Sequence, residues 1–222
     1  MSHIFPPGFV IFDFDGVLAD TDQAWFSVVA EELALFDAVT TVDELLAVHR
    51  GKVIHDSIPI LEQTFSIDLP SSWAERVIAR AIPAIERRFK PVPGSVEAVP
   101  SVAGAGLPVA VASGSLRRAL VSGIKRLGLQ EVLNGRLVSS HDDGQHKPLP
   151  DVYLRCCALL GMLPEHGVAI EDSPTGVASA STAGLTVVGF AAHGDEKSLY
   201  DAGAQTVIQR MNQLPETLSL RA

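Results

Sequence analysis

The fold of this chain is decided by nine residues near its start, FVIFDFDGV, from Phe9 to Val17. The first four are apolar at consecutive rather than alternate positions, which is typical of a strand buried on both faces of a parallel sheet. Asp13 and Asp15 follow, and Gly16 permits a sharp turn after them. In an open α/β sheet, ligands bind beyond the carboxyl ends of the strands. The stretch therefore predicts a central strand whose end carries a site.

Similar apolar runs recur along the chain and alternate with helical patterns. The runs cover residues 107–112, 137–138, 167–170 and 185–190, and helices are expected at 117–127, 151–160 and 175–183. Strand–helix alternation of this kind is typical of a sheet with helices on both faces. We therefore expect an α/β fold, with a doubly wound Rossmann-like parallel sheet as its core.

One region interrupts this alternation. From about residue 22 to residue 89 the sequence contains no convincing strand, and helices are expected at 24–35, 42–48 and 72–89. Pro91, Pro93 and Gly94 then mark the return to the α/β pattern. We expect an inserted α-helical cap domain, residues 21–90, on a catalytic core formed by residues 1–20 and 91–222. The alternative is extra helices packed on the core as part of one domain.

The composition excludes several classes of protein. Of the 222 residues, 47% are hydrophobic and 19% are charged, which is globular rather than disordered. The formal net charge of −9 disfavours nucleic acid as a partner. The sequence has no long apolar run for a membrane and no secretory pattern at its start, and the adjacent Cys156 and Cys157 are expected to be reduced. We therefore expect a cytoplasmic protein with no nucleic-acid or membrane partner, its oligomeric state open.

Two of the predicted strand ends carry polar groups suited to anions and cations. The carboxylates of Asp13 and Asp15 would repel each other, so they either share a proton or have a cation between them. Ser113 and Gly114 follow the strand at 107–112, where a hydroxyl and backbone N–H groups can bind an anion. Serine is also a common helix N-cap, so this second pattern is weak by itself.

Two further patterns complete the candidate site. Lys147 stands just ahead of a predicted helix, where its ammonium could reach a phosphate, although a solvated surface lysine fits the same position. Glu171 and Asp172 end another apolar run, and a site with only oxygen ligands favours a hard cation, above all Mg²⁺. The same acids would also suit the positive end of a helix dipole, and the two roles are compatible.

These four sequence elements are Asp13 with Asp15, Ser113 with Gly114, Lys147, and Glu171 with Asp172. In this order, they resemble those of the haloacid dehalogenase-like superfamily of phosphotransfer enzymes. The helical insertion is similar to the small cap of that superfamily. Residues 171–184, EDSPTGVASASTAG, resemble the subfamily that contains β-phosphoglucomutase and many sugar-phosphate phosphatases. True dehalogenases lack the second aspartate of the first element, so Asp15 indicates phosphate chemistry.

The resemblance implies a role for each matching residue. Asp13 would be the nucleophile that forms an aspartyl-phosphate, and Asp15 the general acid and then the base. Mg²⁺ would be held by the Asp13 carboxylate, the Asp15 backbone carbonyl and Asp172, with Glu171 binding directly or through water. Lys147 would be catalytic too, steadying the nucleophile and the phosphoryl group, and the Ser113 hydroxyl and the Gly114 N–H would hold phosphate oxygens. Apart from the resemblance, the cations Arg50 and Lys52 in the cap are expected to bind the anionic substrate.

The function implied is a magnesium-dependent phosphoric monoester hydrolase acting on a small phosphorylated metabolite, a sugar phosphate above all. One alternative is a phosphosugar mutase, but β-phosphoglucomutases carry a histidine where this chain has Trp25. A second is a non-catalytic binding protein, which would not need both Asp13 and Asp15. A third is phosphonate cleavage through a Schiff base on Lys52, although a lysine of ordinary pKa is a weak nucleophile.

Overall fold

The computed structural model describes residues 7–49, 54–192 and 195–220. The chain divides into two compact units, one formed by Met1–Ala19 with Pro91–Ala222, the other by Asp20–Lys90. We refer to them as the α/β unit and the helical unit. Among the described residues, no helix is both long and apolar enough to cross a membrane.

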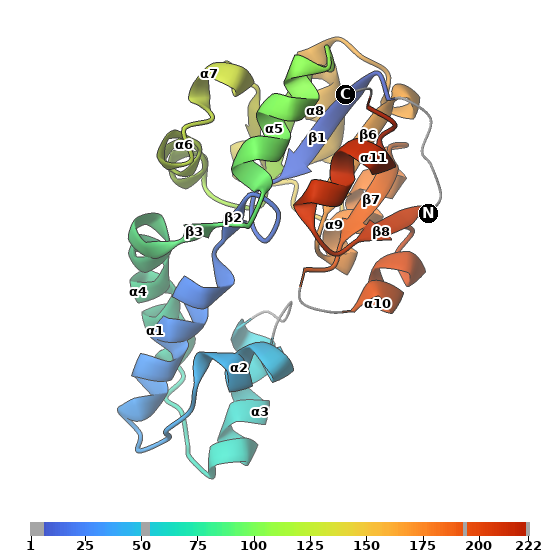
Figure 1. The fold of residues 1–222 in the computed structure, drawn as a ribbon. Helices are drawn as coiled ribbons and strands as arrows, with labels where there is room; N and C mark the ends of the chain where they lie inside the picture. Colours follow the sequence, from blue (N-terminus) through green and yellow to red (C-terminus); the bar gives the residue numbers. More distant parts are fainter. Residues whose placement is uncertain (1–6, 50–53, 193–194, 221–222) are drawn as a thin grey trace. The chain divides into compact units, whose positions relative to one another are not determined.

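The α/β unit is built on a six-stranded sheet in the order β5-β4-β1-β6-β7-β8, in which each neighbouring pair is parallel (Figure 1). The strands are β1 Phe9–Asp13, β4 Val109–Ser113, β5 Leu137–Ser139, β6 Gly167–Glu171, β7 Thr186–Phe190 and β8 Thr206–Ile208. The predicted doubly wound parallel sheet is therefore confirmed. The sequence pattern did not predict β8, which has only three residues.

Helices cover both faces of this sheet (Figure 1). They are α5 Ser95–Gly104, α6 Arg117–Arg126, α7 Gln130–Leu133, α8 Asp151–Leu160, α9 Pro174–Thr182, α10 Glu196–Asp201 and α11 Leu214–Thr217, with short 3₁₀ turns η1 Ser140–Asp142, η2 Pro164–His166 and η3 Met211–Gln213. Phe9 and Ile11 pack with α8 and α9 in one apolar cluster. Because side chains alternate along a strand, Asp13 continues the same face. Cys156 and Cys157 lie in α8, buried and reduced as predicted.

The order of the strands explains where the site lies. β1 stands between β4 and β6; the chain first proceeds outward from β1 through β4 to β5, and later returns to β6 and continues to β8. The strand order thus reverses beside β1, and such a switch point opens a crevice at the carboxyl ends of the strands. The last residues of the strands there are Asp13, Ser113 and Glu171.

The helical unit contains α1 Asp22–Ala34, α2 Val42–His49, α3 Ile54–Phe65 and α4 Trp73–Arg88. Its apolar core includes Leu33, Leu61 and the fully buried Trp73. Glu32 is also buried, and it accepts bonds from Arg76 at 2.7 Å and Arg80 at 2.6 Å, which join α1 to α4. The two chain connections, β2 Ala19–Asp20 and β3 Lys90–Pro91, form a two-stranded sheet.

Candidate active site

Asp13 is the last residue of β1, and only 4% of its surface is exposed. The Lys147 ammonium donates to Asp13 Oδ1 at 2.5 Å. Burial raises the pKa of Asp13 well above its ordinary value; Lys147 opposes this, while Glu171, Asp15 and Asp172 add to it. The carboxylate is thus held in a place where negative charge is already concentrated.

Lys147 precedes α8 and is largely enclosed, with 12% of its side chain exposed. Besides Asp13, it donates to Glu171 Oε1 at 2.6 Å. Burial lowers the pKa of Lys147, but the carboxylates of Asp13 and Glu171 outweigh this and leave it above its ordinary value. The amine is therefore a fixed positive charge, and the alternative of a solvated surface lysine is wrong.

Glu171 ends β6 and is fully buried. Its Oε1 accepts a second bond, from the Tyr153 hydroxyl at 2.5 Å, and its Oε2 accepts from the Ser173 hydroxyl at 3.2 Å. Ser173 also caps α9, because its oxygen accepts from the Gly176 N–H at 3.1 Å. The backbone of α9 approaches so closely that a Cβ on Gly176 would lie 2.0 Å from Glu171 Oε1.

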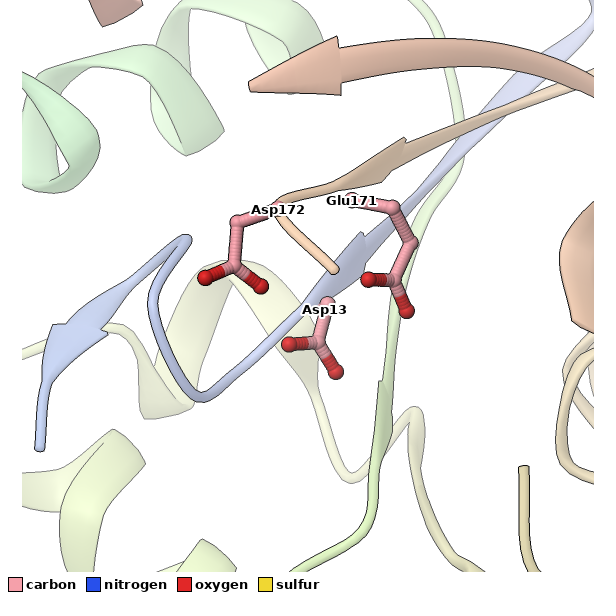
Figure 2. Close-up of side chains that lie close together, drawn as sticks. All are labelled: Asp13, Glu171 and Asp172. Atoms are coloured by element: carbon pink, nitrogen blue, oxygen red, sulfur yellow. The ribbon is translucent and has the colours of Figure 1, made fainter. Parts of the chain in front are cut away.

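Asp172 completes a cluster of three carboxylates. One oxygen from each of Asp13, Glu171 and Asp172 lies within 4.8 Å of the others, and Figure 2 shows all three groups on the same side of the strand ends. Gly16 lies against Asp172, since a Cβ there would be 2.0 Å from its Oδ2. Gly16 also has a φ of +82°, so both its backbone and its surroundings favour glycine.

Asp15 lies in the turn after β1, beside the end of β4. Its Oδ2 accepts from the Ser113 hydroxyl at 3.2 Å and from the Ser115 hydroxyl at 2.8 Å. The Ser113 oxygen in turn accepts from the Ser115 N–H at 2.9 Å. Gly114 between them is exposed. The structure thus brings the first two predicted elements into direct contact.

The three carboxylates suit a divalent cation. They supply only oxygen donors, which hard cations such as Mg²⁺ prefer. Burial is the chief cause that raises the pKa of Asp13, and the nearby charges of Glu171, Asp15 and Asp172 raise it further, so the carboxylates repel one another. A cation between Asp13 and Asp172 would offset the repulsion, so the residues present fit the predicted metal.

Six predicted site residues of the core thus gather at one edge of the sheet, with Gly114 next to them, while Arg50 and Lys52 lie outside the described residues. Three contacts were not predicted: those of Ser115, Tyr153 and Ser173. Tyr153 is in the first turn of the helix after Lys147, and a buried phenol needs a hydrogen-bond partner. This need for a hydrogen-bond partner is the signal in the sequence that could have indicated a contact of Tyr153 with a polar residue such as Glu171.

Fold and site together define an open parallel α/β protein with a carboxylate centre at the switch point of its sheet. Residues 10–190 match the family model described as haloacid dehalogenase-like hydrolase. The chain belongs to this family, as its motifs predicted.

Several relatives of the chain are named phosphatases. It is 29% identical over 218 residues to the phosphorylated carbohydrates phosphatase of Thermotoga maritima, covering 94% of this chain and 99% of that protein. It is 32% identical over 184 residues to hexitol phosphatase B of Escherichia coli, covering 78% of each. These relatives confirm the predicted enzyme class, a phosphoric monoester hydrolase.

A solved structure has the same fold over nearly the whole length. The HAD family hydrolase of Deinococcus radiodurans R1, with bound phosphate and sodium, superposes with a TM-score of 0.84 at 28% identity and covers 96% of both chains. Because this match covers nearly the whole of both chains, it confirms the predicted fold class for more of the chain than the six-stranded sheet.

Proposed function

We propose that this chain is a magnesium-dependent phosphatase that hydrolyses small sugar phosphates through an aspartyl-phosphate on Asp13. The observation that carries the proposal is the buried Asp13 carboxylate, with Lys147 on one oxygen at 2.5 Å and the carboxylates of Glu171 and Asp172 close by. The relatives whose names specify carbohydrate and hexitol phosphates support this substrate class.

The reaction uses the side chains at the strand ends. The Asp13 carboxylate attacks phosphorus, and the leaving oxygen takes a proton from Asp15. Asp15 then removes a proton from the water that hydrolyses the aspartyl-phosphate. Ser113 and the Gly114 N–H bind phosphoryl oxygens, and Lys147 holds Asp13 in place while offsetting negative charge.

The metal would be held by the Asp13 carboxylate, the Asp15 backbone carbonyl and Asp172, with Glu171 directly or through water. Mg²⁺ bound there would supply positive charge that stabilises the phosphoryl oxygens. The charges then balance: a divalent cation and Lys147 offset three of the four carboxylates, and Asp15 carries a proton. A phosphate dianion can approach such a site without strong repulsion.

The helical unit would act as the cap, residues 21–90, on the core of residues 1–20 and 91–222. Arg50 and Lys52 remain predicted substrate contacts. Trp25, in α1, packs against the apolar core of the helical unit. An indole offers no group for acid–base chemistry, which favours the phosphatase over the mutase. We place the enzyme in the cytoplasm.

A panel of phosphorylated metabolites tests the proposal, with release of inorganic phosphate measured in the presence of Mg²⁺. We expect release from sugar and hexitol phosphates. Conversion of a hexose 1-phosphate to its 6-phosphate without release would identify a mutase. Binding of these esters with no turnover would identify a non-catalytic binding protein.

A further inference from the structure

Tyr153 contacts the carboxylate cluster, yet the mechanism above gives it no task. Its side chain is fully buried in the first turn of α8, and its hydroxyl donates to Glu171 Oε1 at 2.5 Å. A hydrogen bond to a carboxylate is shorter and stronger than one between neutral groups. Tyr153 therefore makes a polar contact with the site in addition to packing in the apolar core.

The oxygen that Tyr153 uses is the one that Lys147 uses. Lys147 donates to the same Oε1 at 2.6 Å, so two donors share a single carboxylate oxygen with two lone pairs. The other oxygen of Glu171 accepts from Ser173 at 3.2 Å. Glu171 is thus held with Oε1 fully occupied by protein donors.

The ring of Tyr153 adds a second contact. Lys147 Nζ lies 5.1 Å from the ring centroid, within the range of a cation–π interaction. One side chain therefore touches both partners of the Lys147–Glu171 pair, the hydroxyl on the carboxylate and the ring on the ammonium. The backbone at Gly176 closes another side, where there is no room for a Cβ beside the carboxylate.

We propose that Tyr153 is a positioning residue that holds Glu171 on Lys147 and keeps its carboxylate out of direct contact with the metal ion. Asp13 and Asp172 are then the carboxylate ligands, and Glu171 acts through water. The proposal rests on the proposed function, and it decides between the two roles that the sequence left open for Glu171.

Tyr153→Phe tests this, because it removes the hydroxyl and keeps the ring. A freed lone pair on Oε1 lets Glu171 turn to the metal. In calorimetric titration of the full chain with MgCl₂, the dissociation constant should fall by about 3- to 10-fold, since each added carboxylate ligand tightens the site. Turnover should show kcat lower by about 10-fold and KM changed far less, as for a lost bond to a charged group.

Tyr200→Phe is the matched control, since Tyr200 is the other tyrosine of the chain and is 48% exposed in α10. It should change neither the Mg²⁺ affinity nor kcat. A Tyr153→Phe protein with a lower Tm but unchanged Mg²⁺ affinity and kcat would overturn the proposal. Weaker Mg²⁺ binding would overturn it too, because Tyr153 would then be supporting a directly ligating Glu171.

Two further measurements distinguish a wrong proposal from a variant that does not fold and from a wrong proposed function. If Tyr153→Phe does not fold, Glu171→Gln supplies the metal readout, and it should weaken Mg²⁺ binding much less than Asp172→Asn; equal losses would contradict the proposal. If the unaltered chain releases no phosphate from any ester, the proposed function fails. The Mg²⁺ titration still reports the position of Glu171 in that case.

Discussion

Two glycines beside the carboxylates occupy places where any side chain would collide with the site. Gly16 lies against Asp172, and Gly176 lies against Glu171, each with a missing Cβ only 2.0 Å from a carboxylate oxygen. Both carboxylates are thereby packed against backbone. Glu171 has little freedom to yield, because Lys147, Tyr153 and Ser173 bind it from other directions.

Gly176→Ala should therefore impair the site. The helix itself gains, since alanine is the better helix former, but the methyl group must push Glu171 off its donors. We expect kcat/KM to fall by about 10- to 100-fold, the cost of disrupting bonds to a charged group, together with a lower Tm. Steady-state kinetics and thermal unfolding measure the two effects.

Gly104→Ala is the control for this substitution. Gly104 ends α5, and nothing lies within 4 Å of the place where its Cβ would be. It should keep full activity. Unaltered kcat/KM in Gly176→Ala would mean that the Glu171 carboxylate is not held where the structure has it.

Single residues differ in how far sequence predicted them. Asp13 and Glu171 were predicted because each directly follows a buried apolar run and ends its strand, and Asp15 and Asp172 because they lie within two residues of these strand ends. Tyr153 was not predicted as a contact of Glu171, because 18 positions separate them and only the packing of α8 on the sheet brings them together.

At the scale of elements, a network of charges ties α6, η1 and α8 together. Asp142 in η1 accepts from Arg117 Nε at 2.8 Å and from Arg155 Nη2 at 3.1 Å. The bond from Arg117 is the chief cause that lowers the pKa of Asp142 to about 2. The carboxyl side chain is 19% exposed and Arg117 is 48% exposed, so solvent screens part of the interaction.

Asp142→Asn should lower the free energy of unfolding by about 1 kcal/mol at pH 7, after allowance for screening. A carboxyl whose pKa is depressed by folding stabilises the protein above its unfolded pKa, and this stabilisation is lost as pH falls through the folded pKa. The difference in the free energy of unfolding between the variant and the unaltered chain should thus persist down to about pH 4 and shrink towards pH 2. Urea titrations at several pH values measure it.

Asp68→Asn is the control, because it removes an exposed carboxylate of the helical unit. It should change the free energy of unfolding little at any of these pH values. A penalty for Asp142→Asn that stays constant down to the lowest accessible pH would show that its charge is not what stabilises the fold.

The prediction of elements was uneven, since the three-residue strand β5 was predicted and the ten-residue helix α5 was not. The expected helix at 151–160 matches α8, and the strand at 167–170 needed only Glu171 added. The short elements β8 and α7 carry too few residues to show a period. The helix at 175–183 begins one residue earlier than expected, because Ser173 caps it and Pro174 suits its first position.

At the scale of the whole molecule, an acidic chain with a net charge of −9 is proposed to bind an anionic substrate. The local balance at the strand ends makes this feasible, since Lys147 and a divalent cation would neutralise the carboxylates where the phosphate binds. The overall charge predicts poor binding of polyanions, whereas the site alone decides the binding of a small phosphate ester.

Removal of the metal should therefore abolish turnover. Activity should disappear with a chelator and return with excess Mg²⁺. Ca²⁺ should bind and inhibit, because its higher coordination number invites both oxygens of a carboxylate and would tie up Asp13. Full activity of metal-stripped protein in the presence of chelator would contradict the proposal that the carboxylate cluster binds a metal ion needed for turnover.

Rapid-quench mass spectrometry during turnover of a sugar phosphate examines the proposed chemistry at Asp13 itself. We predict the added mass of one phosphoryl group on the peptide that contains Asp13. Asp13→Asn, which keeps the shape but cannot attack phosphorus, should carry none and lose more than about a thousandfold in kcat. A phosphoryl group found on a different residue, or near-normal turnover by Asp13→Asn, would contradict the proposed mechanism.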